Sequence, residues 1–162
     1  MKTELTTLLP ALRRFAYSLT GSMPDADDLV QNTLLRILKS PPPEDVPLLK
    51  WAFKVCRNQW IDDYRSQKVR TEATQKPELQ AENYSDGEAD MINDITLGEV
   101  NQAMNSLSDD QREVLSLIAV QGMSYSEAAD VLAIPTGTIM SRLARARANM
   151  VSFFKQPNGS MA

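Results

Sequence analysis

The stretch that most constrains the fold covers residues 124–147. Ser124 is followed three residues later by Glu127, which is the spacing of a capping box, where the two side chains satisfy backbone N–H groups at a helix start. Pro135 disfavours helical geometry at the residue before it and supplies the φ angle of a new helix's first turn. The stretch therefore predicts two short helices, with a change of direction between residues 133 and 136.

The second of these helices combines an apolar stripe with a basic face. Ile139 and Leu143 are spaced to point inward. A basic second helix in a helix-turn-helix can enter the DNA major groove, where Arg pairs with guanine and Ser or Thr contacts bases or phosphates. A surface helix with solvated arginines is the alternative interpretation. The outward face carries Thr138, Met140, Ser141, Arg142, Arg145 and Arg147.

Composition argues against a membrane protein and against an enzyme. No apolar run is long enough to cross a bilayer and the N-terminus lacks a signal-peptide pattern, so we expect a cytoplasmic protein. The chain has no histidine and one cysteine, so the commonest general base and metal ligand is missing. We therefore expect no catalytic activity, no cofactor and no bound metal. Cys56 lies among Phe53, Val55 and Trp60, and we interpret it as a core residue rather than a reactive thiol.

The net charge of −4 is unevenly distributed along the 162 residues. Residues 1–70 carry 11 basic and 8 acidic side chains, residues 71–110 carry 1 and 10, and residues 111–162 carry 5 and 3. Two mildly basic ends are thus separated by an acidic middle. This pattern predicts two modules that face DNA or a partner, with an acidic connector between them.

Apolar spacings of three and four predict two helices in the first 40 residues. The first covers residues 4–19, and Gly21 and Pro24 separate it from a second that extends to residue 39. The second helix buries one apolar face, which we expect to include Leu38. Its other face is mixed and polar around one leucine; such a face is usually solvated, and a partner site is the alternative. That face carries Asp28, Gln31, Asn32, Leu35 and Arg36.

A third helix, predicted over residues 48–65, is both aromatic and basic. Aromatic residues at helical spacing are often core residues, and Phe53 and Trp60 fit that interpretation. Rings that alternate with cations also suit single-stranded nucleic acid, because bases stack on rings while cations follow phosphates. The spacing leaves both interpretations open. The residues concerned are Lys50, Trp51, Phe53, Lys54, Arg57, Trp60, Tyr64 and Arg65.

The rest of the chain predicts a linker and further helices. Residues 71–94 are polar and acidic, and cannot bury enough apolar area to offset their ordering entropy. A helix follows over residues 95–105, and Ser108 and Gln111 form a second capping box for a helix that we expect to bury Val120 and to end at Gly122. We predict an all-α fold of two small helical domains, residues 1–70 and 95–155, joined by an acidic flexible linker and followed by a tail, residues 156–162.

Five segments in this order resemble the extracytoplasmic-function class of sigma-70 factors, the small two-domain initiation subunits of bacterial RNA polymerase. They are L-R-R-F-A-Y-S-L-T-G at 12–21, D-A-D-D-L-V-Q-N-T-L-L-R at 25–36, W-A-F-K-V-C-R-N-Q-W-I-D-D-Y-R at 51–65, L-S-D-D-Q-R-E-V-L at 107–115, and P-T-G-T-I-M-S-R-L-A-R-A-R at 135–147. The resemblance implies that the two domains are sigma regions 2 and 4.

The resemblance also implies roles for individual residues. The helix that ends at residue 39 would dock on the clamp helices of the polymerase largest subunit through Asp28, Gln31, Asn32, Leu35 and Arg36. The third helix would recognise and melt the promoter −10 element through Trp51, Lys54, Arg57, Asn58, Trp60 and Arg65, with Asn58 holding a flipped-out base. The helix-turn-helix would recognise the −35 element through Ser124, Tyr125, Thr136, Thr138, Met140, Ser141, Arg142, Arg145 and Arg147.

This chain departs from many relatives at two places. Met140 and Ala144 stand where a basic and an aromatic residue are common, so the −35 preference cannot be copied from a relative. Arg57 and Trp60 are larger than many relatives place around the matching Asn. Members of the family are commonly held inactive by an anti-sigma factor, so we expect core RNA polymerase, promoter DNA and an anti-sigma factor as partners.

Two alternative functions remain. A sigma-like decoy would bind an anti-sigma factor without using a promoter, but such decoys carry a receiver domain, for which we expect no room here. A simple helix-turn-helix regulator would leave the match at residues 25–36 and the aromatic, basic third helix unexplained.

Overall fold

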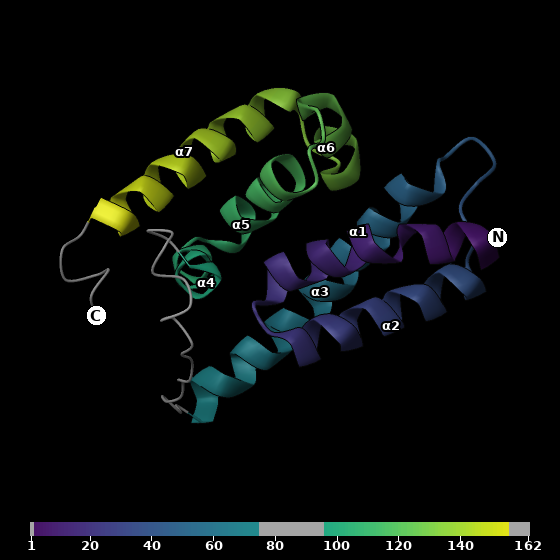
Figure 1. Cartoon of the computed structure of the whole chain (residues 1–162), viewed down its shortest axis with the longest axis horizontal. Helices are drawn as coiled ribbons and strands as arrows, with labels where there is room; N and C mark the ends of the chain where they lie inside the picture. Colours follow the sequence, from purple (N-terminus) through teal and green to yellow (C-terminus); the bar gives the residue numbers. More distant parts are fainter. Residues whose placement is uncertain (1, 75–95, 156–162) are drawn as a thin grey trace.

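The computed structural model describes residues 2–74 and 96–155, and these residues form helices joined by short loops. The N-terminal bundle consists of α1 (Lys2–Thr20), α2 (Met23–Lys39) and α3 (Leu48–Thr74). The C-terminal bundle consists of α4 (Leu97–Asn105), α5 (Asp109–Leu115), the π-helical turn η2 (Ser116–Val120), α6 (Tyr125–Leu132) and α7 (Thr136–Lys155) (Figure 1). The predicted all-α fold is confirmed. The predicted tail and most of the predicted linker lie outside the described residues.

The core of the N-terminal bundle is built around two aromatic rings. Phe15 of α1 and Phe53 of α3 meet edge to face, with their ring centroids 5.0 Å apart, and both side chains are fully buried. Cys56 is also buried, as the sequence predicted, and its burial raises the pKa of the thiol to about 12. A thiol with that pKa is almost entirely protonated at neutral pH and is a poor nucleophile. Leu38, however, is 56% exposed, so its predicted burial is wrong.

Helix α3 is longer than the sequence predicted. It continues to Thr74, whereas the aromatic and basic pattern predicted an end near residue 65. Residues 66–74 include Gln, Lys, Arg, Glu and Ala, which favour helices. Pro77 is the first proline in the sequence after α3, and proline breaks a helix. The side chains of residues 64–74 are outside the described set, so the predicted −10 contact Arg65 can be placed on α3 only by its backbone.

The helix-turn-helix forms as its capping signals predict. Ser124 Oγ accepts from the Glu127 N–H at 3.0 Å, and Glu127 Oε1 accepts from the Ser124 N–H at 2.9 Å. The turn is made by Ala133, whose φ of 56° places it in the left-handed region. Thr136 then begins α7, which buries Ile139 on its inner face.

The second predicted capping box forms only in part. Ser108 Oγ accepts from the Gln111 N–H at 3.2 Å, but the Gln111 side chain instead accepts from Asn149 Nδ2 at 2.9 Å. A tertiary contact to α7 has thus replaced the local one. Val120 is 40% exposed, which contradicts its predicted burial, because the π-helical turn rotates it out of the packing face.

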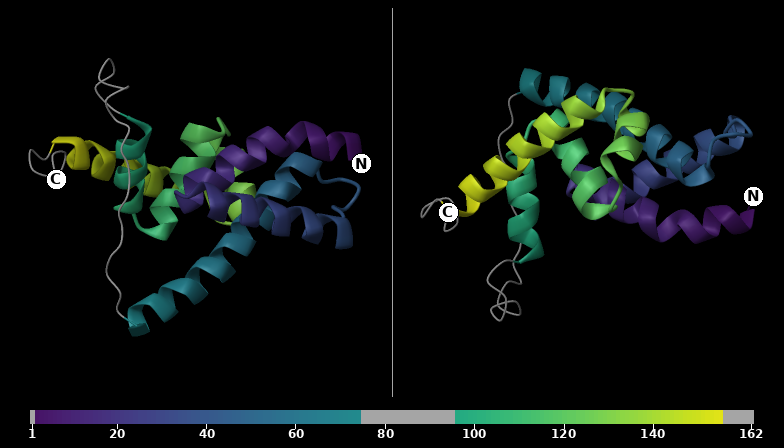
Figure 2. Two further views of the ribbon diagram at one scale, coloured as in Figure 1. Left: turned by 60° about the horizontal axis from the view of Figure 1, so that its bottom comes forward. Right: turned by 90° about the horizontal axis from the view of Figure 1, so that it is seen from above.

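The two bundles pack directly against each other. Helix α1 contacts η2, and α3 contacts α6, so that one continuous apolar cluster includes residues of both bundles. Figure 2 shows the C-terminal bundle lying along one side of α1 and α3. Gly21, which ends α1 with a φ of +75°, lies at this junction. None of the described helices is both long and apolar enough to span a membrane.

Candidate functional sites

The first candidate site is the outward face of α2. Its five predicted contact residues, Asp28, Gln31, Asn32, Leu35 and Arg36, are all exposed, and Leu35 is 53% exposed. A single exposed leucine among polar side chains is common on protein surfaces, so its exposure makes this face accessible to a partner without identifying one. We call these five residues the α2 face.

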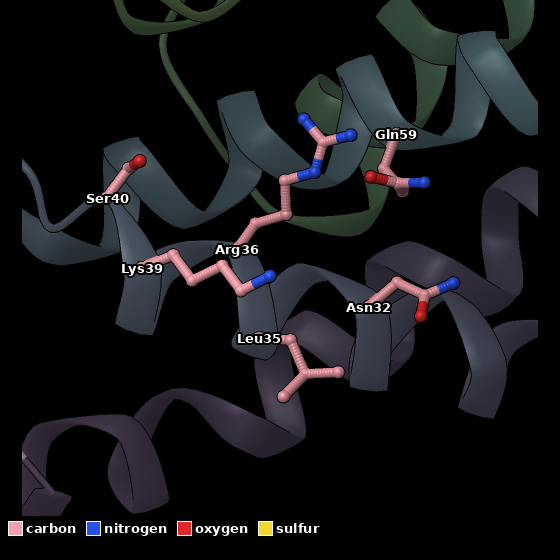
Figure 3. A pocket seen from close by; sticks show the side chains of 6 residues that line it. All are labelled: Asn32, Leu35, Arg36, Lys39, Ser40 and Gln59. Atoms are coloured by element: carbon pink, nitrogen blue, oxygen red, sulfur yellow. The ribbon is translucent and has the colours of Figure 1, made fainter.

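A pocket of about 340 Å³ lies between the α2 face and α3. Figure 3 shows Arg36 extending from α2 toward Gln59 of α3, with Lys39 one helical turn further along α2. The two cations and the amides of Asn32 and Gln59 would suit an anionic or hydrogen-bonding group of a partner. Sequence patterns missed Gln59, Lys39 and Ser40 because Lys39 and Ser40 lie at the end of α2, whereas Gln59 lies on α3. The lining residues are Asn32, Leu35, Arg36, Lys39, Ser40 and Gln59.

The second candidate site is α3, where the predicted −10 residues differ in exposure. Asn58 is exposed, and Trp51 and Lys54 are half-buried. Trp51 Nε1 donates to the Ser40 carbonyl oxygen at 3.1 Å, which fixes the indole against the end of α2. Trp60 is only 2% exposed, so its ring cannot stack on a base in this arrangement. Its predicted role in DNA binding is corrected to a core role, because it occupies the same apolar face as Phe53 and Cys56.

Arg57 of α3 joins the two bundles. Its Nε donates to Glu113 Oε1 at 2.7 Å and its Nη2 donates to Glu113 Oε2 at 3.2 Å, a bidentate pair. Its Nη1 donates to Asn58 Oδ1 at 3.1 Å. The Glu113 side chain has no exposed area. Burial raises the pKa of the Glu113 carboxyl above its ordinary value, and the hydrogen bonds and charge of Arg57 oppose that rise without cancelling it.

The third candidate site is the helix-turn-helix. Met140 is 52% exposed and Tyr125 38%, and Thr138 is half-buried. Arg142 is partly buried and lies 3.6 Å from Asp110 of α5, so a carboxylate competes for its guanidinium. The remaining predicted contacts, Ser124, Thr136, Ser141, Arg145 and Arg147, are all exposed. The turn therefore presents a mixed polar and basic surface on the first half of α7.

Sequence patterns gave no indication of the part that Glu113 plays. A charged residue next to Val114 on a short helix is normally solvated, and its partner Arg57 is 56 residues away in the sequence. A buried position for Glu113 would be detectable only from the packing of both bundles.

Comparison with known proteins matches both bundles to one family. The model of Sigma-70 region 2 matches residues 5–70, and the model of Sigma-70, region 4 matches residues 97–150. An ECF RNA polymerase sigma factor, EcfG, of Rhodopseudomonas palustris is 34% identical over 154 residues, which are 93% of this chain and 82% of the relative.

Solved structures agree with these matches. The sigma factor RpoE in complex with the anti-sigma factor NepR, from Bartonella quintana, superimposes with a TM-score of 0.79 at 32% identity, covering 96% of this chain and 97% of that one. A structure of the anti-anti-sigma factor PhyR with NepR, from the same organism, gives a TM-score of 0.59 at 20% identity over 48% of that chain, a likeness of fold alone. The resemblance found in the five sequence segments is thus confirmed, and the chain belongs to the extracytoplasmic-function class of the sigma-70 family of RNA polymerase sigma factors.

Proposed function

We propose that this sigma factor directs core RNA polymerase to its promoters by dividing three tasks among three surfaces. The α2 face binds the polymerase, α3 recognises and opens the −10 element, and α7 recognises the −35 element. The observation that carries this proposal is that the exposed α2 face and the exposed basic surface of α7 occur in one chain whose two bundles match sigma regions 2 and 4. The protein acts in the cytoplasm, with the polymerase, and contributes binding rather than a catalytic step of its own.

The −35 contacts are made by α7. The exposed Arg145 can form a bidentate pair with guanine, whereas Met140 and the methyl group of Thr138 suit apolar contact with a thymine methyl group. Arg147 and the exposed hydroxyls at the start of α6 and α7 suit phosphates, which position the helix without specifying sequence. The base preference at Met140 is therefore apolar rather than hydrogen-bonding.

The −10 contacts are made by the exposed edge of α3. The amide of Asn58 can hydrogen-bond a base that has left the stack, and such bonds offset part of the few kcal/mol that extrusion costs, as a general estimate for base flipping. Lys54 lies one turn before Asn58 and would contact the backbone phosphates. Trp51 offers the half-buried aromatic ring of this edge, and Trp60 supports the helix from inside.

Polymerase binding uses the α2 face together with the neighbouring pocket. Leu35 supplies apolar contact, while Arg36 and Lys39 supply charge for acidic groups of the polymerase clamp helices. The pocket also borders α3, so the polymerase and the −10 helix would share Gln59. An exposed leucine at the centre with polar residues around it is the usual arrangement of an interface core and rim.

An anti-sigma factor is the further partner in this proposal. Its support is the similarity to RpoE, which was solved in complex with the anti-sigma factor NepR. The weaker likeness to the anti-anti-sigma factor PhyR leaves a decoy as the competing function. A decoy would bind the anti-sigma factor but would not start transcription.

The test is run-off transcription with the purified protein, bacterial core polymerase and a fragmented library of the source genome. We expect discrete transcripts that depend on the protein, and their aligned upstream sequences should contain two conserved elements. Binding of core without transcripts would contradict the promoter-recognition part of the proposal. If core is not bound at all while an anti-sigma factor is, the decoy function is correct instead.

A further inference from the structure

Two consecutive amide side chains on α3, Asn58 and Gln59, are each bound to a charged residue of the same helix. An amide carries an acceptor oxygen and a donor NH2 group. A partner that can only donate binds the oxygen, and a partner that can only accept binds the NH2 group. The charged partner of each amide therefore decides which end of the amide is left for another molecule.

Arg57 holds the amide of Asn58. Its Nη1 donates to Asn58 Oδ1 at 3.1 Å, and a guanidinium has no acceptor atom, so the oxygen must be the end that faces it. Within the part of the chain that the structure describes, the NH2 group of Asn58 donates to no other atom. Because Asn58 is exposed, this NH2 group is available to a ligand.

The bond from Arg57 also changes the hydrogen-bonding strength of the two ends of the Asn58 amide. Nε and Nη2 of Arg57 donate to the carboxylate of Glu113, so Nη1 is the nitrogen that serves Asn58. Hydrogen bonds in a chain polarise one another. A cation bound at the amide oxygen therefore makes the NH2 group a stronger donor, and makes the oxygen a poorer acceptor for a second N–H group.

Asp63 holds the amide of Gln59 in the opposite sense. Gln59 Nε2 donates to both carboxylate oxygens of Asp63 at 3.2 Å, and a carboxylate can only accept. Gln59 Oε1 is left buried and has no hydrogen-bond partner among the described residues. Position 58 thus presents a donor, whereas the next position keeps an acceptor.

The free NH2 group of Asn58 restricts the base edges that this residue can recognise. Adenine places an amino donor next to a ring acceptor, and an Asn or Gln amide that binds it bidentately uses both its oxygen and its NH2 group. Cytosine and thymine carry carbonyl oxygens that accept hydrogen bonds, and cytosine has a ring nitrogen acceptor beside its carbonyl. An amide whose oxygen is already bound to a guanidinium therefore matches a pyrimidine better than adenine.

We infer that Arg57 is a positioning residue for the −10 element: it fixes the Asn58 amide with its NH2 group toward the extruded base, and so favours a pyrimidine over adenine there. This inference rests on the proposed function, in which Asn58 hydrogen-bonds a base that has left the stack. Arg57 then acts through Asn58 instead of contacting DNA itself. Base preference at one position is a property that a merely structural arginine would not set.

The test measures base preference on templates that are already open. Holoenzyme of the full chain with bacterial core polymerase is bound to a promoter found by run-off transcription, with its −10 region unpaired and randomised. Sequencing of the bound fraction gives the preference at each position. The position that Asn58 recognises is the one at which Asn58→Ala abolishes the preference. Unpaired templates report recognition of the base, because the duplex is already open when the protein binds.

Two variants remove the bond to Asn58 with different effects on charge. Arg57→Lys keeps a cation for the buried Glu113 but lacks the fork that reaches both partners. The double variant Arg57→Met with Glu113→Gln removes both charges, so that no buried carboxylate is left without its partner. In both, the ratio of pyrimidine to adenine at the Asn58 position should fall about three- to tenfold, the value of one ordinary hydrogen bond.

Two further variants are controls for charge and for the neighbouring amide. Lys54→Met removes a cation one turn before Asn58, so it should weaken binding of all sequences alike. Asp63→Asn releases the amide of Gln59, and it should leave the preference at the Asn58 position unchanged.

An unchanged ratio in both Arg57 variants would overturn the inference, as would a native preference for adenine at this position. A fall in only one of the two variants would trace the effect to charge or packing, and an equal fall in Lys54→Met would trace it to charge; each would also overturn the inference. If native holoenzyme enriches no −10 sequence, the proposed function itself fails. If it enriches one but Asn58→Ala changes no position, promoter recognition stands and this inference falls.

Discussion

Helices α3 and α7 both carry predicted DNA contacts, but they differ in how many of these residues are exposed to solvent. On α7 the apolar stripe of Ile139 and Leu143 is buried and the basic side faces solvent. On α3 the aromatic and basic residues are divided among the core, the contact with the C-terminal bundle, and positions at the surface that are predicted to contact the −10 element. The difference shows that a clean amphipathic pattern predicts exposure residue by residue, whereas the pattern of a helix with several packed neighbours does not.

The largest effect that tests this comparison is at Trp60. We expect Trp60→Ala to lower the free energy of unfolding by about 3–5 kcal/mol, because it removes a buried ring and leaves a cavity. Urea denaturation followed by circular dichroism measures it, and Trp51→Ala, at a half-buried position, should cost clearly less. Unchanged stability together with lost −10 opening would restore Trp60 as a DNA contact.

On α7 the corresponding test is Arg145→Ala. The exposed guanidinium can reach base edges, so we expect a loss of about 1–3 kcal/mol in discrimination between the correct −35 element and a mutated one. Competition binding of holoenzyme to the two promoters measures the loss. Arg142→Ala should have a smaller effect on discrimination, because Asp110 already shares its charge. Lys155→Ala, at the far end of α7, is the matched control, and an equal loss there would refute base recognition by Arg145.

The substitution Asn58→Ala tests the proposed −10 contacts of α3. Removing its amide should slow open-complex formation about tenfold, the value of one well-formed hydrogen bond of roughly 1–1.5 kcal/mol. Closed-complex binding should change much less, because the base is still stacked at that stage. Stopped-flow fluorescence separates the two steps. Asp62→Ala, exposed on the same helix, should change neither, and equal losses of both steps in Asn58→Ala would exclude the base-holding role.

The smallest effect concerns the pH dependence of Glu113. Its pKa in the folded chain is raised, so it contributes stability below its ordinary pKa that is lost as pH rises through the raised value. The charged groups around it are Arg57 of α3, Asp110 of α5 and Arg142 of α7. Glu113→Gln cannot ionise. The free energy of unfolding of the native chain should therefore fall relative to that of the variant as pH rises, and urea denaturation at several pH values measures this. A constant difference would mean that the ion pair with Arg57 cancels the effect of burial on this pKa, and a difference of the opposite slope would mean that it outweighs burial.

Local signals predicted most of the fold. The capping box of Ser124 and Glu127 formed as expected, and apolar spacing placed the helix ends to within a few residues, except the C-terminal end of α3, which was predicted near residue 65 and lies at Thr74. Errors arose where tertiary contacts override local ones. Gln111 leaves its capping position to bond Asn149, and the π-helical turn exposes Val120.

The candidate sites were less predictable than the fold. The exposure of the α2 face followed from periodicity, and its meaning came from the family resemblance. The roles of Trp60 and Trp51 could not be separated by spacing, because one face of α3 is covered by α1 and α2 while another is only partly covered. Glu113 could not be predicted, because its burial depends on how two distant bundles pack.

Gly21 lies in the turn after α1, where the two bundles meet, and its backbone conformation affects their packing. A Cβ atom at this position would lie 2.6 Å from Asn101 Oδ1 and 3.2 Å from Arg112 Nη2, and any L side chain would also be strained at a φ of +75°. Both neighbours belong to the C-terminal bundle, so every substitution here pushes on the contact between the bundles. A substitution at position 21 would therefore disturb the packing of the two bundles without altering any residue that is predicted to touch a promoter.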